Sequence, residues 1–373
     1  MQLPGRILAQ AMPILAHKIE ITPNTAAVAF FRNCAGAARF GYNWALNGWN
    51  TQYEAGDKPS AYSLKKGFNA FKADLPWSAE IPAAVFSNAT LNLGVAFKNF
   101  FKKTGKHPVF KSRHTAKKSF NPWDGGRLSL DGDRVRIPNF GWVRLRESLR
   151  FVGRIVQGII SEKAGKWFLT ITVEVEKHEK PRLSSQAIGL DLGVKALVVD
   201  SNGETYAGPK PLKGLLKKLQ RLSRRLSRKV KGSANRAKAK LEVARLHAKI
   251  ANIRSDYQHK LTTKLVLENT NIAIEDLNVS GMVRNHCLAR ALMDQAFGEF
   301  RRMLTYKAGL YGAVLHVVSR WFPSTKTCSG CGSVKDMNLS DRTYECLCGM
   351  VLDRDHNAAI NLKNQIPVLD REF

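Results

Sequence analysis

The sequence predicts an α/β protein with a β-rich N-terminal part that carries a helical insertion, followed by a C-terminal α/β part. Three observations indicate this class. Residues 188–200 form two apolar strands around a tight turn, residues 210–265 have leucines at helical spacing, and residues 109–176 alternate apolar and polar positions between Gly-rich turns. A chain of 373 residues is long enough for two or three domains with their own cores.

The N-terminal part is predicted to be a small β-barrel that is interrupted by helices. Residues 16–21 have the pattern of a strand, and Thr22 is the expected cap of the helix that follows. Further helices are predicted over 63–75 and 83–103, before the short strands that end at 167–175. We expect the strand near Ile19 to pair with those later strands, which makes the helical block an insertion.

The net charge points to a polyanionic partner. The chain has 59 Lys and Arg against 30 Asp and Glu, a net charge of +29. A membrane surface is the less favoured partner, because no apolar run approaches the ~18 residues that span a bilayer. The N-terminus also lacks the apolar core of a signal peptide. Nucleic acid is therefore the expected partner.

The positive charge is concentrated in the predicted helical pair. Between Lys210 and Arg254 there are 16 Lys and Arg and a single acid, Glu242. A surface helix held by ion pairs would mix the two signs, so this pair is expected to follow a nucleic-acid backbone. A basic loop is a second candidate, for which a solvated surface is an equally good interpretation. The predicted phosphate contacts are Lys217, Lys218, Arg221, Arg224, Arg225, Arg228, Lys229 and Arg236 in the helices, and Lys111 and Arg113 in the loop.

Three acids stand at the ends of apolar elements: Asp191, Glu275 and Asp355. Taken singly, Asp191 could simply bond its turn, and Asp353 or Asp355 could simply cap the last helix. Strand alternation places Glu275 in the closely packed row and turns Asp276 outward. Together in a very basic chain, the three predict a Mg²⁺ site with hard oxygen ligands. Two such ions about 4 Å apart would activate water and stabilise the leaving 3′-oxygen of a phosphodiester.

Four of the six cysteines are closely spaced near the C-terminus: Cys328, Cys331, Cys346 and Cys348. Four thiolates satisfy tetrahedral Zn²⁺, and the neighbouring glycines let the backbone turn its amides toward the sulfurs. The second pair is C-x-C where C-x-x-C is usual, which tightens the geometry. Such a site implies a reducing compartment. A helix over 289–310 and a strand over 314–318 are expected just before it.

With these residues in view, the chain resembles the TnpB family, transposon-encoded RNA-guided DNA endonucleases related to type V CRISPR effectors. The resemblance covers nearly the whole length and is most specific in residues 189–193, 274–277 and 353–359 and in the cysteine cluster. It implies an RNase H-like RuvC domain whose triad falls on Asp191, Glu275 and Asp355. Asp355 is preferred to Asp353 because the family's last acid stands two residues before the Asn of the Asn-Ala-Ala run. The cysteines match the family's zinc-binding insertion.

The same resemblance implies the domain boundaries and the partners. A wedge β-barrel would span 1–29 and 109–182, around a helical recognition lobe at 30–108. The nuclease domain would span 183–373, with the basic helical pair at 210–265 and the zinc-binding insertion at about 322–352. The implied partners are a guide RNA from the transposon end and double-stranded target DNA beside a short flanking motif. The implied location is the prokaryotic cytoplasm, in association with the nucleoid.

Other function classes stay open at this point. One is a nuclease-dead, RNA-guided DNA-binding repressor, against which the presence of all three acids argues. A second is a strand-transfer transposase built on the same RNase H-like fold. An ATP-binding protein with an Asp-x-Gly phosphate hairpin is less favoured, because neither a P-loop nor a second phosphate turn is evident.

Overall fold

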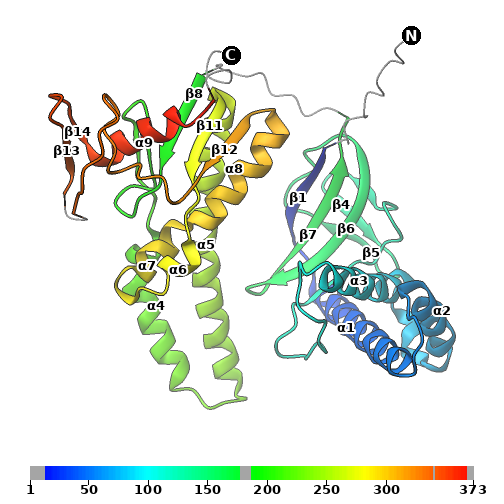
Figure 1. Cartoon of the computed structure of the whole chain (residues 1–373). Helices are drawn as coiled ribbons and strands as arrows, with labels where there is room; N and C mark the ends of the chain where they lie inside the picture. Colours follow the sequence, from blue (N-terminus) through cyan, green and yellow to red (C-terminus); the bar gives the residue numbers. More distant parts are fainter. Residues whose placement is uncertain (1–12, 177–185, 339–340, 368–373) are drawn as a thin grey trace, which may run out of the picture. The chain divides into compact units, whose positions relative to one another are not determined.

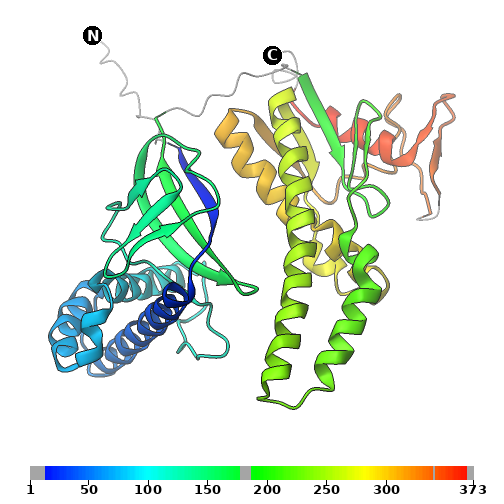
Figure 2. The same ribbon diagram turned by 180° about the vertical axis from the view of Figure 1, so that it is seen from behind.

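The computed structural model describes residues 13–176, 186–338 and 341–367. The chain divides into two compact units, Met1–Lys177 and His178–Phe373 (Figure 1, Figure 2). The predicted junction between the wedge and nuclease domains, at residues 182–183, lies outside the described residues.

In the first unit, the N-terminal strand pairs with the last one. β1 (Ile14–Ile21) runs antiparallel to β7 (Lys166–Glu174), so that residues far apart in the chain lie side by side. The described strands form a four-stranded sheet of order β1-β7-β6-β2 and a three-stranded sheet of order β3-β4-β5, which share one core. The prediction that the strand near Ile19 joins the later strands is confirmed. The remaining strands are β2 (Ser119–Phe120), β3 (Ser129–Asp131), β4 (Arg134–Ile137), β5 (Gly141–Arg144) and β6 (Arg154–Lys163).

Three helices lie between β1 and β2 in this unit (Figure 1): α1 (Thr25–Glu54), α2 (Ala61–Phe71) and α3 (Ala83–Phe101). Asn24 caps α1 by accepting a hydrogen bond from the Ala27 N–H at 2.8 Å. The prediction that Thr22 caps this helix was wrong, because the Thr22 hydroxyl donates to the Arg144 carbonyl. α2 ends at Phe71, before residue 75, where the predicted helix ends. Two 3₁₀ turns follow it, η1 (Lys72–Asp74) and η2 (Pro76–Glu80).

The second unit is built on a mixed five-stranded sheet of order β10-β9-β8-β11-β12. Three adjacent strands, β8 (Gln186–Asp191), β11 (Asn269–Glu275) and β12 (Val314–Val318), are parallel, with β12 at the edge. Both faces of the sheet are covered, which explains the apolar runs Ala187–Leu190 in β8 and Ile272–Ile274 in β11. One face packs on α5 and α8, and the other on α9 (Arg354–Asn364). The antiparallel edge consists of β9 (Val198–Asp200) and β10 (Thr205–Tyr206).

The helical pair predicted over 210–265 is present as α4 (Pro211–Ser227) and α5 (Ala234–Glu268), which lie side by side (Figure 2). The single helix predicted over 289–310 is instead broken at Ala296, which has a φ of 53°. Gln258 of α5 donates to the Gln295 carbonyl at 2.7 Å, a tertiary bond at the break that the sequence pattern does not signal. The remaining elements are α6 (Val279–Met282), α7 (His286–Gln295), α8 (Phe297–Tyr311), β13 (Thr343–Glu345) and β14 (Val351–Asp353).

Candidate functional site

Asp191 and Glu275 stand at the carboxyl ends of adjacent parallel strands. β8 and β11 pair with Leu190 opposite Ile274, so the two acids that follow are neighbours. Leu190 and Ile274 belong to the core on the α5 and α8 face, whereas Ala273 packs on the α9 side. Because side chains alternate along a strand, both acids belong to the α9 face.

Asp355 comes to the same face from the first turn of α9, which packs against β8. The approach depends on Gly189. A Cβ at this position would lie 2.0 Å from the Ala359 carbonyl oxygen and 2.5 Å from the Lys363 nitrogen. The helix backbone therefore lies directly on the strand. In the sequence Gly189 is only the first residue of the 189–193 motif, and its packing role becomes visible only in the structure.

Asp191 is buried, and the charges of the other two acids disfavour its ionised form. Burial, and then the charges of Asp355 and Glu275, raise the pKa of Asp191 to about 7, and Arg354 opposes the shift. Burial and the neighbouring Asp276 raise the pKa of Glu275 as well. Buried carboxylates that repel one another are stabilised by a shared dication, and hard oxygen donors suit Mg²⁺. The three acids fit such a site chemically.

The two adjacent acids have structural partners. Asp276 forms ion pairs with Arg301 and Arg320, and their hydrogen bonds hold the pKa of its carboxyl below the usual range. Asp353 caps α9, accepting from the Asp355 N–H at 2.9 Å and from the His356 N–H at 3.2 Å. Asp276 is therefore engaged by arginines, in agreement with its predicted outward orientation. Asp353 acts as the helix cap that its position before α9 allowed.

The four cysteines form a compact cluster of sulfurs. Within the described parts of the chain, they are the only group of three or more His, Cys, Asp or Glu whose ligand atoms all lie within 4.8 Å of one another. Cys328 Sγ lies 3.7 Å from Cys348 Sγ, and Cys331 Sγ lies 3.5 Å from Cys346 Sγ. Four sulfurs at ~2.3 Å from a tetrahedral Zn²⁺ are about 3.8 Å apart. The cluster therefore fits a structural zinc site, C-x-C spacing included.

A glycine in the left-handed region closes each half of the cysteine cluster. The Gly332 N–H donates to the Cys328 carbonyl at 2.9 Å, and the Gly349 N–H donates to the Cys346 carbonyl at 3.0 Å. Their φ angles of 77° and 88° favour glycine, which explains the Cys-Gly pairs in the sequence. Tyr344, which is fully buried, donates its hydroxyl to the Lys326 carbonyl at 3.0 Å and to the Ser333 carbonyl at 3.3 Å, in the segment that carries Cys328 and Cys331.

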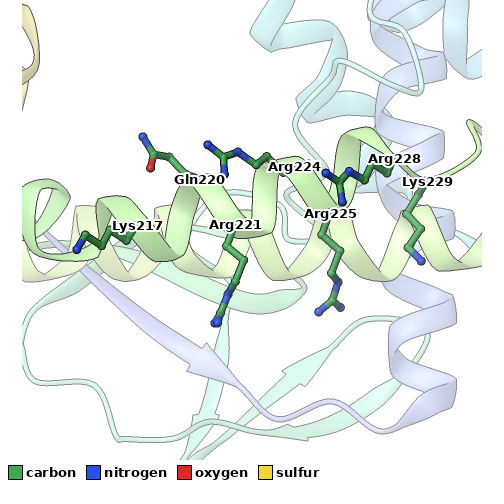
Figure 3. Close-up of a pocket in the computed structure, with 7 residues that line it drawn as sticks. All are labelled: Lys217, Gln220, Arg221, Arg224, Arg225, Arg228 and Lys229. Atoms are coloured by element: carbon green, nitrogen blue, oxygen red, sulfur yellow. The ribbon is translucent and has the colours of Figure 1, made fainter.

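The predicted basic surface lies on α4. Seven residues line an open concavity along this helix (Figure 3): Lys217, Gln220, Arg221, Arg224, Arg225, Arg228 and Lys229. In Figure 3, Arg221, Arg225 and Lys229 point the same way; Arg221 and Arg225 are at i, i+4 spacing in α4, and Lys229 follows just after the helix ends. Arg225 also pairs with Glu242 at 2.8 Å. The surface therefore presents a row of cations with one acid beside it.

Two of the predicted phosphate contacts, Arg236 and Lys111, make contacts within the chain. Arg236 Nη1 donates to the Leu226 carbonyl at 3.0 Å and to the Lys229 carbonyl at 2.8 Å, which closes the connection between α4 and α5. The Lys111 ammonium lies 3.4 Å from the centroid of the Tyr42 ring. Arg113 is exposed in the same loop as Lys111. Within the described residues, no helix has both the length and the apolar character needed to cross a membrane.

Family models match three segments of the chain. A model described as "Probable transposase" (OrfB_IS605) matches residues 170–286, and a "Cas12f1-like, TNB domain" model matches 297–362. A "Helix-turn-helix domain" model matches 12–58, where the described structure is β1 followed by one long helix, α1.

Relatives match over most of the chain. A Streptomyces pristinaespiralis protein named as an RNA-guided DNA endonuclease is 36% identical over 93% of this chain and 88% of its own length. A similarly named Escherichia coli protein, InsQ, is 34% identical over 93% of this chain and 91% of its own. The fold is similar to Cas12f1 in its complex with single-guide RNA and target DNA, at a TM-score of 0.61 and 15% identity, covering 92% of this chain and 83% of Cas12f1. The chain is a member of the TnpB family.

Proposed function

We propose that this chain is an RNA-guided DNA endonuclease of a transposable element, which hydrolyses phosphodiester bonds at Asp191, Glu275 and Asp355. One observation supports this site most directly: Asp191 and Glu275 stand side by side at the ends of β8 and β11, and α9, which carries Asp355 in its first turn, packs on β8. The bacterial relatives are named as RNA-guided DNA endonucleases, which supports both the cleavage activity and the use of a guide RNA. Specificity would come from base pairing between guide and target, with the protein holding the heteroduplex backbone.

The three acids would hold Mg²⁺, with Asp191 as the shared ligand and Glu275 and Asp355 on either side. Bound there, the metal would activate a water and stabilise the leaving 3′-oxygen. The chain itself fixes the positions of these three carboxylates. The paired ends of β8 and β11 fix two carboxylates, and the close packing of α9 on Gly189 fixes the third. The zinc site would be structural and would shape the entry to this centre.

The partners and domain boundaries follow from the same proposal. The guide RNA would derive from the transposon end, and the target would be double-stranded DNA beside a flanking motif. The wedge domain would span residues 1–29 and 109–182, the recognition lobe residues 30–108 and the nuclease domain residues 183–373. A net charge of +29 would keep the protein with the bacterial nucleoid.

The test is to purify the chain from cells that carry its native locus and to sequence the RNA that co-purifies. We expect one RNA with a constant transposon-derived part, which directs Mg²⁺-dependent cleavage of a matching duplex. Guided binding without cleavage would favour the repressor, and joined DNA products would favour the transposase. The absence of any specific RNA would contradict the proposal.

Mg²⁺ binding should depend on pH around neutrality. Asp191, with its pKa raised to about 7, is largely protonated below that pH, so Mg²⁺ must displace a proton. We expect the affinity to fall by up to about tenfold for each pH unit below 7. The same shift means that the metal-free protein loses stability as the pH rises toward 7, because the folded state binds the proton more tightly. Calorimetry in two buffers of different ionisation enthalpy measures the proton release, and an affinity that is flat between about pH 5.5 and 8 would contradict this.

Removing charge from α4 should weaken nucleic-acid binding. We expect the triple variant Arg221→Gln, Arg224→Gln and Arg228→Gln to lower guide RNA affinity and to reduce the salt slope by up to about 3, because each arginine that contacts a phosphate releases counterions. Filter binding over a salt series measures both quantities. The matched control removes three arginines that pair with acids in the first unit, Arg134, Arg144 and Arg150. Equal effects of the two triple variants would mean that α4 has no special role.

A further inference from the structure

We propose that the four-cysteine cluster positions Asp355 through two asparagines of α9, so that zinc binding and Mg²⁺ binding are energetically coupled. Asn357 and Asn361 are positioning residues in this proposal, which rests on the function proposed above.

The first anchor surrounds the first zinc ligand, Cys328. Asn357 Nδ2 donates to the Thr327 carbonyl at 2.7 Å, and Asn357 Oδ1 accepts from the Ser329 N–H at 3.0 Å. One side chain of α9 therefore binds the backbone on both sides of Cys328. Asn357 is only two residues beyond Asp355, in the same helix.

Asn361 repeats the contact one helical turn later. Its Nδ2 donates to the Thr327 carbonyl at 2.6 Å and to the Ser324 carbonyl at 2.8 Å. The i, i+4 spacing places both asparagines on one face of α9. Asn357 is 0% exposed and Asn361 is 4% exposed, so leaving these amides unpaired would carry a desolvation cost. The contacts therefore fix the helix relative to the cysteine cluster.

The second anchor comes from the other half of the cluster. β13 leads directly into Cys346, and its residue Thr343 lies opposite Asp353, the cap of α9. Just before β13, the Arg342 carbonyl accepts from the Arg354 N–H at 2.7 Å. The Arg342 guanidinium also lies 3.9 Å from Asp355 Oδ2. The start of α9 is thus held by the chain segment that carries the second cysteine pair.

Zinc would join the two anchors. Cys328 and Cys331 belong to the half held by the asparagines, and Cys346 and Cys348 to the half held through β13. Without a metal, side-chain hydrogen bonds connect these halves: the Tyr344 hydroxyl donates to the Lys326 carbonyl at 3.0 Å and to the Ser333 carbonyl at 3.3 Å, and the Lys335 ammonium donates to the Glu345 carbonyl. Since α9 lies between this module and β8, with its backbone at Ala359 and Lys363 against Gly189, movement of either half would shift Asp355.

The test is a thermodynamic cycle on the full chain, with Mn²⁺ as the probe. Electron paramagnetic resonance measures Mn²⁺ binding, and the part lost in Asp191→Ala reports the acid site. We expect the zinc-free variant Cys331→Ser/Cys346→Ser to weaken this binding about tenfold. Asn357→Leu/Asn361→Leu, with zinc still bound, should weaken it to a similar extent. Combining all four changes should cost no more than either pair alone, because both pairs break one connection.

A matched control makes the same amide-to-leucine change at Gln365, an exposed residue just after α9, and should leave Mn²⁺ binding unchanged. The milder Asn361→Ala serves if the double asparagine variant does not fold, with a smaller loss expected. A Mn²⁺ affinity that is the same with and without zinc would overturn the coupling. So would fully additive losses of Mn²⁺ affinity when the cysteine and asparagine changes are combined.

Hydrogen exchange separates failure of this inference from failure of the proposed function. We expect zinc loss to speed amide exchange in the first turns of α9 while exchange in β11 stays slow. If Asp191→Ala leaves Mn²⁺ binding unchanged while α9 still responds to zinc, the Mg²⁺ site fails and the mechanical connection stands. If the acid site binds Mn²⁺ but neither its affinity nor α9 exchange responds to zinc, the connection fails alone.

Discussion

Asp191→Ala should reduce DNA cleavage by at least about a thousandfold, while guide-dependent binding to target DNA stays measurable. A shared metal ligand contributes several kcal/mol of transition-state stabilisation, and each 1.4 kcal/mol corresponds to roughly tenfold in rate. Binding should persist because it depends on base pairing and on basic surfaces away from the sheet end. The substitution also removes a buried, electrostatically repelled carboxyl, so the fold should not be destabilised.

Single-turnover cleavage and binding are measured on the same guide-loaded preparation. Asp256→Ala, at an exposed acid of α5, is the matched control and should change neither quantity. Asp353→Ala should lose only a helix cap, about 1 kcal/mol of stability, with a partial loss of cleavage. Binding that is lost together with cleavage would identify Asp191 as a folding residue.

Gly189→Ala should have the second-largest effect, although it removes no functional group. Its methyl group would lie 2.0 Å from the Ala359 carbonyl oxygen, and both partners are backbone. α9 must therefore move away from β8 and carry Asp355 with it. A displacement of about 1 Å at a catalytic group costs on the order of a hundredfold in rate, and overpacking costs about 1–3 kcal/mol in stability.

Cleavage rate, thermal unfolding and Mn²⁺ affinity are measured together for this variant. Gly298→Ala in α8 is the matched control, since a Cβ there has no neighbour within 4 Å. This control should raise stability slightly, because alanine favours the helix over glycine. Normal cleavage in Gly189→Ala would mean that the close packing of α9 does not set the position of Asp355.

Several features were predictable because their signals are local. Acids at the ends of the apolar stretches before Asp191 and Glu275 indicated strand ends, and alternation gave the correct face for Glu275. The four cysteines indicated a zinc site because ligand spacing is itself a local pattern. The leucine period of 210–265 predicted α4 and α5 for the same reason.

Other features were decided only by tertiary contacts. The break at Ala296 coincides with a hydrogen bond from α5, and the cap of α1 is Asn24, two residues after the predicted Thr22. Arg236 and Lys111 were grouped with the other basic residues because charge shows in a sequence, whereas the carbonyls and the ring that engage them do not.

The sequence by itself determined the classes of chemistry in this protein: carboxylates at strand ends, a thiolate cluster and a basic helical pair. Only the tertiary structure decided how these parts meet. Nothing in the sequence near Gly189 shows why a glycine is needed there, because α9, which packs on it, lies far along the chain. Asn357 and Asn361 have an ordinary helical spacing, and only their contacts around Cys328 give them a role. Contacts between distant segments leave no periodic trace in a sequence, because packing fixes them after the local elements have formed.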